Sequence, residues 1–307
     1  MKRVGSAVFL RQEQKILKQS VMRFATQPGV TSFRRPEGRT CIYMKNLKGK
    51  IVWITGASSG IGEALAYAFA KEGAFLVLSA RHTEKLEQVK TTCLVTTSKC
   101  WVQPADLSDV HQLEEVVKTV LAKTGRVDLL INNAGKSQRS WAKETPLEID
   151  RSIMELNFFS VIALTKLVLP QMLKNQSGHL VVISSINGKL GFPMRTAYSA
   201  SKHAVQGYFE SLRAELVNDN IQVTIVSPGR IKTNISLNAL TKNGMPYNKM
   251  DDGQANGMNA DVCAAKIVNA IKKDRKELLV GQREIIMVYI RRFIPALYHK
   301  IVTKINN

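Results

Sequence analysis

A glycine-rich turn between an apolar strand and a helix constrains the fold of this chain most. The apolar run Ile51–Thr55 leads into the pattern T-G-x-x-x-G-x-G at 55–62, and an alanine-rich segment continues directly from it at 63–70. Glycine has no Cβ, so the backbone can approach a pyrophosphate, and the free amides at a helix N-terminus attract that negative charge. This order predicts the first unit of a dinucleotide-binding α/β fold, although such a turn can also form without a ligand.

From residue 50 onward, short apolar runs alternate with amphipathic stretches, which is typical of a parallel sheet with helices on both faces. We expect seven strands, at Ile51–Thr55, Phe75–Ser79, Cys100–Gln103, Val127–Ile131, Leu180–Ser184, Val223–Ser227 and Leu278–Val280. The segments between them include predicted helices at Ile61–Glu72, Val110–Lys123, Leu147–Lys174 and Ser199–Asn218. The fold class is α/β, a Rossmann-type doubly wound sheet of about seven parallel strands in a single domain at 44–283.

The two ends of the chain differ from this central region. Of 307 residues, 44 are Lys or Arg and 24 are Asp or Glu, and residues 1–50 alone hold twelve of the basic residues against two acids. We expect residues 1–43 to be a disordered extension or a mitochondrial targeting peptide, since Met44 is a natural start for a compact domain. The basic amphipathic tail 284–307 is expected to pack on its own domain, to pack across a dimer or to lie on a membrane surface.

Composition excludes several other classes of protein. No apolar stretch is long enough for a membrane-spanning helix, and no segment resembles a DNA-recognition helix, a zinc finger or an aromatic platform for single strands. The four cysteines form no C-x-x-C pair and have no histidine at zinc-ligand spacing; they are Cys41, Cys93, Cys100 and Cys263. We therefore expect a cytoplasmic protein with reduced thiols, no metal and no nucleic-acid partner.

The end of the second predicted strand indicates which dinucleotide is bound. A carboxylate at this point binds a ribose 2′-hydroxyl, whereas a cation binds a 2′-phosphate. The strand Phe75–Ser79 is followed by Ala80, Arg81 and His82, with no acid. Because a guanidinium can bind a phosphate through two hydrogen bonds, NADP(H) is favoured over NAD(H), unless Arg81 is only a solvated loop residue. Asp106, after the third strand, is placed to contact the adenine or to cap the next helix.

A tyrosine, a lysine and a serine are candidates for acid/base chemistry. Tyr198 and Lys202 stand at positions i and i+4, on one face at the start of a predicted helix. A phenol with a pKa of about 10 is a weak base at neutral pH, and a nearby cation favours its ionised form. Ser185 follows the strand Leu180–Ser184, at the edge where parallel sheets bind ligands. Taken singly, such a pair is usually two surface neighbours and such a serine is usually a turn residue.

Together these residues resemble the short-chain dehydrogenase/reductase family. The shared pattern is T-G-x-x-x-G-x-G at 55–62, N-N-A-G at 132–135, Asn157, Ser185, Y-x-x-x-K at 198–202 and P-G at 228–229. The serine precedes the tyrosine by 13 residues and the asparagine precedes the serine by 28, as in that family's active site. The resemblance covers about residues 48–285, and the segment 133–140 is most similar to the group called dehydrogenase/reductase member seven.

The resemblance implies a role for each of four catalytic residues. Tyr198 is the general acid/base, and Lys202 lowers its pKa and binds the nicotinamide ribose. Ser185 orients the substrate oxygen, and Asn157 anchors a water-linked proton relay. The implied function is hydride transfer between the nicotinamide of NADP(H) and a small-molecule carbonyl or secondary alcohol, in a homo-oligomer. The alternative is a catalytically idle sensor that binds the dinucleotide, but a sensor would not need these four residues.

The family pattern also implies the cofactor contacts. The residues expected to bind the dinucleotide are Gly56, Ser58, Ser59, Gly60, Ile61, Gly62, Arg81, Asp106, Leu107, Asn133, Ala134, Gly135, Tyr198, Lys202, Pro228, Gly229, Ile231 and Thr233. In the family, the segment 132–135 flanks the adenine and the last four of these residues surround the nicotinamide.

A weakly periodic segment at 234–259 suits a mobile lid over the substrate. Its larger side chains either line a lipophilic pocket or pack against the body of the domain; they are Met245, Tyr247, Met250 and Met258. The sequence does not name the substrate beyond a carbonyl or an alcohol.

Overall fold

A seven-stranded parallel sheet forms the centre of the domain. The computed structural model describes residues 46–304, so the extension expected at 1–43 lies outside the described residues. The strands run in the order β3-β2-β1-β4-β5-β6-β9, with every neighbouring pair parallel. Their bounds are β1 Ile51–Thr55, β2 Phe75–Ser79, β3 Cys100–Val102, β4 Leu129–Asn132, β5 Gly178–Ile183, β6 Ile221–Pro228 and β9 Glu277–Val280. The predicted Rossmann-type fold is confirmed.

Helices connect these strands. The longer ones are α2 Gly60–Lys71, α3 Thr83–Cys93, α4 Leu113–Thr124, α5 Leu147–Met154, α6 Ser160–Lys174, α7 Thr196–Glu215 and α9 Ala260–Lys272. Shorter helical turns are η1 Val110–Gln112, η2 Ala142–Glu144, η3 Glu155–Phe159, η4 Ile186–Gly188, η5 Leu216–Asn218, α8 Asp252–Ala255 and η6 Arg283–Ile285. The last of the predicted helices begins earlier than expected, at Thr196, so Tyr198 lies in its first turn.

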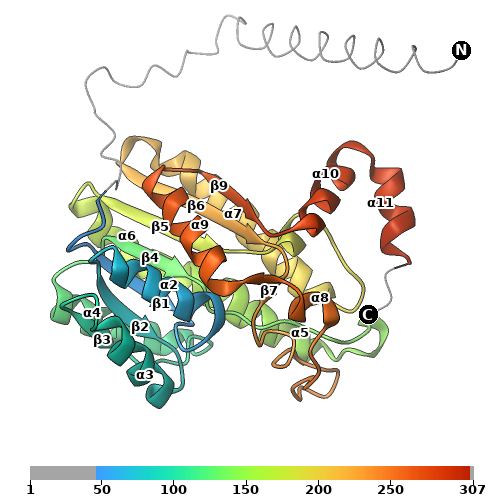
Figure 1. Ribbon diagram of the computed structural model, residues 1–307, viewed down its shortest axis with the longest axis horizontal. Coiled ribbons are helices and arrows are strands. Elements are labelled where there is room, and N and C mark those ends of the chain that lie inside the picture. The colour runs from blue at the N-terminus through green and yellow to red at the C-terminus, as the bar shows by residue number, and fades with distance from the viewer. Residues whose placement is uncertain (1–45, 305–307) are drawn as a thin grey trace, which may run out of the picture. The chain divides into compact units, whose positions relative to one another are not determined.

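Helices cover both faces of the sheet, as Figure 1 shows, and the strand sequences explain why. Along β1, Val52 and Ile54 point into one apolar core, whereas Ile51 and Trp53 point into the other. The first core includes residues of α2, α3 and α9, and the second includes residues of α4, α6 and α7. A strand that is buried on both faces has no polar alternation, which accounts for the continuous apolar runs in the sequence.

The predicted helix Leu147–Lys174 is continuous but not uniform. α5 passes through the π-helical turn η3 into α6, and Asn157 lies in that turn. By length and composition, with a mean hydropathy of 1.6, this run could cross a membrane, contrary to the expectation from the sequence. Its side chains Leu164, Val168 and Met172 are buried in the core beside the sheet. Because core packing gives a helix the same composition, the hydropathy is weak evidence for a membrane span.

After β6 the chain forms a loop and two further helices. β7 Ile231–Lys232 pairs with β8 Met258–Asn259, which closes the segment between them into a loop. The expected tail helix is instead two short helices, α10 Ile286–Phe293 and α11 Pro295–Val302, drawn in red in Figure 1. The break falls at Ile294, because the residue before a proline avoids the helical conformation. The hydroxyl of Tyr298 on α11 donates a hydrogen bond to the Gly191 carbonyl.

The strand order determines where a ligand can bind. From β1 the sheet extends through β2 and β3 to one side, and through β4 to β9 on the other. The carboxyl ends of β1 and β4 therefore lie where the order reverses, which is the point at which open α/β sheets bind ligands. The glycine turn follows β1 and the segment 133–135 follows β4, so two of the sequence patterns meet at this edge.

His179, on β5 inside the sheet, is expected to make stability depend on pH. It is fully buried, and its Nε2 lies 2.8 Å from Thr224 Oγ1 on β6. Burial, followed by the charge of Lys276, lowers the pKa of His179 to about 3. Below a pH of about 6.5 the unfolded chain binds a proton there that the folded chain does not. We expect this group to lower the free energy of unfolding by about 1.4 kcal/mol for each unit of falling pH.

Chemical denaturation between about pH 6.5 and pH 4.5 measures this slope. In His179→Gln the part of the slope due to the imidazole should be absent, whatever the variant's stability near neutrality. An identical slope in the two proteins would contradict the prediction.

Candidate active site

A cavity of about 1720 Å³ opens at this edge of the sheet. All but two of the predicted site residues line it, namely Gly56, Ser58, Ser59, Gly60, Ile61, Arg81, Asp106, Leu107, Asn133, Ala134, Gly135, Ser185, Tyr198, Lys202, Pro228, Gly229, Ile231 and Thr233. The two exceptions, Gly62 and Asn157, are buried. Patterns that are far apart in the sequence therefore surround one space.

The turn after β1 requires glycine at three positions. Gly56 and Gly60 have φ angles of +64° and +61°, a conformation that favours glycine. A Cβ on Gly62 would lie 2.2 Å from the Gly56 carbonyl oxygen, so only glycine lets α2 start so close to the turn. Asn133 holds the turn from the neighbouring strand, because its Nδ2 donates to the Thr55 and Gly56 carbonyls at 2.9 and 3.2 Å. The N-terminus of α2 has no side-chain cap, and its residues line the cavity, which suits a pyrophosphate.

Charged residues gather at the end of the cavity next to β2 and β3. Arg81, Lys136 and Asp106 all line it. Burial raises the pKa of Asp106, but two hydrogen bonds from Ser108 and the charges of Arg81 and Lys136 outweigh that effect and lower it. Burial, followed by the charge of Arg81, lowers the pKa of Lys136. Asp106 therefore caps a local turn, while Asp109 caps the next helical turn, η1.

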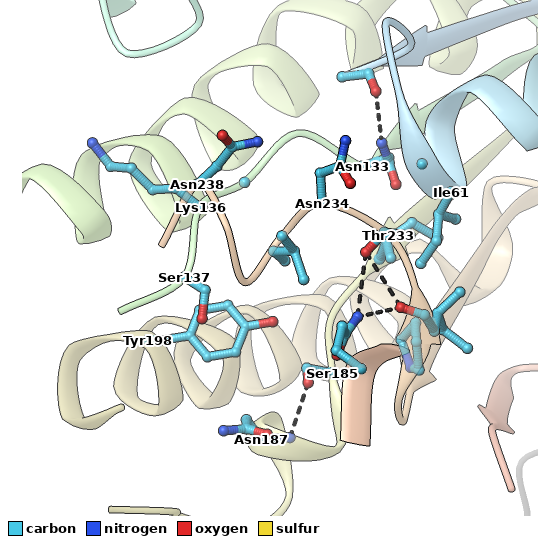
Figure 2. A pocket seen from close by; sticks show the side chains of 18 of the residues that line it. Ile61, Asn133, Lys136, Ser137, Ser185, Asn187, Tyr198, Thr233, Asn234 and Asn238 are labelled. Carbon is cyan, nitrogen blue, oxygen red and sulfur yellow. Dashed lines mark hydrogen bonds between the residues drawn. The ribbon is translucent and has the colours of Figure 1, made fainter. Parts of the chain in front are cut away.

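Tyr198 and Ser185 lie side by side in the cavity. Figure 2 shows the two hydroxyl groups directed into the same space. Tyr198 comes from α7, and Ser185 comes from the turn after β5, where its Oγ accepts a hydrogen bond from the Asn187 amide at 3.1 Å. Burial raises the pKa of Tyr198, and hydrogen bonding with Ser185 and the charges of Arg195 and Arg139 offset only part of that rise. A phenol and a hydroxyl in this arrangement can hold and protonate one oxygen atom of a bound molecule.

Lys202 lies one turn further along α7 and is also buried. Its Nζ donates to the Ile183 carbonyl at 2.8 Å and lies 6.0 Å from the centroid of the Tyr198 ring. Burial lowers the pKa of Lys202 to about 8. Most of the lysine is therefore still charged at neutral pH, and a cation stands near the phenol, as the i, i+4 spacing predicted.

Two buried asparagines have different positions. Asn157 lies behind the cavity wall, where its Oδ1 accepts from the Lys136 amide at 2.9 Å and its Nδ2 donates to the Lys136 carbonyl at 2.9 Å and to Ser201 Oγ at 3.0 Å. The π-helical turn η3 presents it there. Asn132, expected beside the adenine, does not line the cavity and donates instead to Thr165 Oγ1 at 3.1 Å. Only the first asparagine contacts the residues around Tyr198.

The wall on the substrate side contains residues that the sequence did not indicate. It includes Leu156, Phe192, Ile235, Leu240 and Met287. The four larger lid residues at 245, 247, 250 and 258 do not line the cavity. Met245 and Met250 are exposed, and Met258 packs against the core, so these residues do not form the lipophilic pocket that was one of the two alternatives, and Met258 follows the other.

Sequence reasoning also missed a cluster of charged residues in this wall. Asp251 forms ion pairs with Arg139 and Arg195, and all three line the cavity. Arg195 precedes Tyr198 by three residues and Arg139 follows the N-N-A-G pattern by four, but neither spacing indicates a pairing. The one sequence signal for this cluster was that two arginines lie close to the N-N-A-G and Y-x-x-x-K patterns.

The C-terminal tail reaches the cavity as well. Glu284 and Met287 line it, and Glu284 Oε1 accepts hydrogen bonds from the backbone amides of Arg230 at 2.7 Å and Gln282 at 3.1 Å. A Cβ on Gly229 would lie 2.1 Å from that carboxylate oxygen. A side chain at position 229 would therefore displace the Glu284 carboxylate from its present position.

The fold, and Tyr198 with Asn157, Ser185 and Lys202 near it, point to one class of protein. A family model described as short chain dehydrogenase matches residues 50–243, more than half of the chain. The chain therefore belongs to the short-chain dehydrogenase family. It is accordingly an oxidoreductase that acts on CH–OH groups with NAD or NADP as acceptor.

Individual relatives indicate which group within the family the chain resembles. The chain is 44% identical over 267 residues to a dehydrogenase/reductase SDR family protein 7-like of Drosophila melanogaster, covering 85% of this chain and 82% of that protein. It is 44% identical over 264 residues to dehydrogenase/reductase SDR family member 7B of Xenopus laevis, covering 84% and 82%. The similarity to the member seven group that the segment 133–140 predicted is confirmed.

Solved structures of similar proteins hold either dinucleotide. A short chain dehydrogenase/reductase from Burkholderia phymatum in complex with NAD has a TM-score of 0.74 at 25% identity, covering 82% of this chain and 96% of that chain. A metagenomic short-chain oxidoreductase in complex with NADP has a TM-score of 0.65 at 27% identity, covering 76% and 97%. These neighbours support a nicotinamide dinucleotide without deciding between the two.

Proposed function

We propose that this protein transfers a hydride between the nicotinamide of NADP(H) and a carbonyl or secondary alcohol, with Tyr198 as the general acid/base. The observation that carries the proposal is the shared position of the Tyr198 and Ser185 hydroxyls in the cavity (Figure 2). The buried ammonium of Lys202 lies 6.0 Å from the centroid of the Tyr198 ring. The cofactor fits the turn after β1, because Gly56 and Gly60 adopt conformations without room for a side chain and α2 begins there uncapped.

Each residue has a physical task in the proposed reduction. The bound cofactor supplies the hydride to the carbonyl carbon. Negative charge grows on the carbonyl oxygen, to which Ser185 donates a hydrogen bond and Tyr198 delivers its proton. The ammonium of Lys202 stabilises the phenolate that remains. Oxidation of an alcohol runs through the same steps in reverse.

The positions of Asn157 and Lys202 support the proposed proton relay. A Cβ on Gly135 would lie 3.0 Å from Asn157 Oδ1 and 3.5 Å from Lys202 Nζ, so the asparagine and the lysine approach the same backbone position. Asn157 is held rigidly by its hydrogen bonds to the Lys136 backbone. We propose that it anchors a water molecule that returns a proton toward Lys202 and Tyr198.

Tyr198→Phe should lower kcat for ketone reduction at least about a hundredfold, because the ring is kept while the proton donor is lost. The measurement is the consumption of NADPH with a panel of ketones. Tyr208→Phe, a partly buried tyrosine of the same helix that does not line the cavity, is the matched control and should keep its activity.

Full activity of Tyr198→Phe would refute the mechanism. If the wild-type chain binds NADPH but turns over no ketone or alcohol, the alternative of a catalytically idle sensor that binds the dinucleotide is favoured instead.

The proposed preference for NADP(H) rests on the charge at the end of the cavity next to β2. Arg81, Lys85 and Lys136 line this end, and the nearby carboxylate of Asp106 is already engaged by Ser108. Three cations around one carboxylate that is already hydrogen-bonded favour a ligand with an additional phosphate.

Arg81→Ala should weaken NADPH binding about tenfold or more, because a hydrogen bond between charged groups is lost, and should change NADH binding little. Fluorescence titration of both reduced cofactors measures the two dissociation constants. Arg151→Ala, an exposed arginine of α5 outside the cavity, is the control. Equal losses for both cofactors would give Arg81 a structural role instead.

We propose further that the protein is cytoplasmic and that its C-terminal tail contacts a membrane surface. Exposed apolar side chains gather on α10 and at the start of α11, at Ile286, Tyr289, Phe293, Ile294 and Leu297. Exposed cations lie among them at Arg291, Arg292 and Lys300. The acid that precedes them most closely in the sequence, Glu284, accepts a hydrogen bond from the Arg230 amide. An apolar surface with cations at its border complements anionic lipid.

Vesicles containing phosphatidylserine should bring the protein down in sedimentation, whereas neutral phosphatidylcholine vesicles should retain less of it, and salt should weaken the difference. Replacing Tyr289 and Phe293 by serine should reduce this binding. The control is Val95→Ser, an apolar side chain that is 82% exposed elsewhere.

Light scattering on the same variants measures the mass of the particle, and so tests the homo-oligomer that the family resemblance implies. If the tail replacement lowers the mass of the particle and leaves vesicle binding unchanged, the tail packs against a second copy and the membrane proposal fails.

A further inference from the structure

Three charged side chains, one buried and two half-buried, connect the substrate loop with the start of the catalytic helix. Asp251, at the N-cap of α8, accepts hydrogen bonds from Arg139 and from Arg195, the latter at 3.3 Å. Ser236 Oγ also donates to this carboxylate, at 3.1 Å. The side chains of Arg139, Arg195 and Asp251 are only 4%, 15% and 22% exposed. Two guanidiniums against one carboxylate leave one excess positive charge in the cavity wall.

Backbone hydrogen bonds hold the loop independently of this carboxylate. The Leu240 amide donates to the Ser137 carbonyl at 2.9 Å, and the Arg139 amide donates to the Leu240 carbonyl at 2.8 Å. The loop is therefore paired to the segment after β4 like an added strand. Removing only the charge of Asp251 should leave the loop in place.

Gln138 fixes the catalytic helix relative to the same segment. The N-cap residue of α7, Arg195, makes no side-chain cap hydrogen bond. The fully buried Gln138 supplies that cap from elsewhere in the sequence, because its Oε1 accepts from the amides of Ala197 at 2.9 Å and Tyr198 at 3.4 Å. Tyr198 is thus held at a fixed position relative to Arg139, the residue after Gln138.

The charged groups around the Tyr198 phenol come from several elements. Arg195 and Lys202 belong to the start of α7, Arg139 follows β4, and Asp251 comes from the substrate loop. The charges of Arg195 and Arg139 lower the pKa of Tyr198 and so oppose its burial. Burial raises the pKa of Asp251, but the hydrogen bond and charge of Arg139 and the charge of Arg195 outweigh this, so Asp251 stays ionised.

We propose that Asp251 is a positioning residue for Tyr198, because it holds two guanidiniums near the phenol and cancels half of their charge. In this way the docked substrate loop sets the electrostatic potential at the catalytic tyrosine. The inference rests on the role proposed above for Tyr198. It differs from a purely structural role, because a structural loss would reduce activity at every pH without changing the ionisation of the phenol.

The ionisation of Tyr198 can be followed directly in the full chain, without a substrate. Protein labelled with carbon-13 at tyrosine Cζ is titrated by NMR, and the Tyr198 resonance is the one that Tyr198→Phe lacks. Asp251→Asn keeps the shape of the side chain and raises the charge of the cluster from +1 to +2, so the midpoint of Tyr198 should fall by about half a unit or more. Arg195→Met removes a cation and should raise the midpoint.

Matched variants separate this effect from a loss of structure. Arg195→Lys keeps the charge and should stay closer to the wild type than Arg195→Met. Asp261→Asn, an exposed aspartate on α9, should not move the midpoint. Thermal melting of each variant shows that it is folded.

The proposal is overturned if Asp251→Asn leaves the midpoint unchanged or raises it, or if Asp251→Asn and Arg195→Met move it in the same direction. Shifts of opposite sign support it even if Tyr198→Phe retains turnover. In that case the acid/base role of Tyr198 fails, while the electrostatic link between loop and phenol stands.

Discussion

The arrangement of the whole site depends on one close approach, in which the start of α2 lies against the turn after β1. No side chain fits on Gly62, because its Cβ would lie 2.2 Å from the Gly56 carbonyl. This contact brings an uncapped helix N-terminus to the reversal point of the sheet, and Asn133 then ties the turn to the next strand. The position proposed for the dinucleotide follows from these contacts, and residues after β4, β5 and β6 line the same cavity.

Much of this could be predicted because its causes are local. Strands buried on both faces give continuous apolar runs, the turn needs glycine, and Tyr198 and Lys202 are one helical turn apart. The pairing of Arg139 with Asp251 is different, because the two residues are 112 positions apart and neither belongs to a periodic pattern. The π-helical turn around Asn157 has no compositional signature either, so the sequence indicated one uniform helix. Pro295 was a local signal for the break in the tail, but the amphipathic pattern continues across it, so the sequence indicated one tail segment.

The electrostatics of Tyr198 show how burial and charge oppose each other in one cavity. Burial alone disfavours the phenolate, and it also lowers the pKa of Lys202 to about 8, which weakens the cation that the sequence identified as the tyrosine's partner. Hydrogen bonding with Ser185 and the charges of two arginines act against that burial. The arginines are tolerated because Asp251 compensates them, and a buried guanidinium without a partner would be costly. The arginine cluster thus limits the rise in the pKa of Tyr198 that burial in the cavity causes, without reversing it.

The carboxylate of Glu284 joins the tail to the segment that begins at Gly229, which forms one wall of the cavity. If the tail moves far enough to break this contact, the Arg230 amide in that wall loses its hydrogen-bond acceptor, and a ligand that orders the wall would favour the docked tail. Binding at the tail and binding in the cavity would then be linked, and such linkage is reciprocal. If a membrane or partner bound at the tail raised the affinity for the dinucleotide by some factor, the dinucleotide would raise the affinity of the tail for that membrane or partner by the same factor.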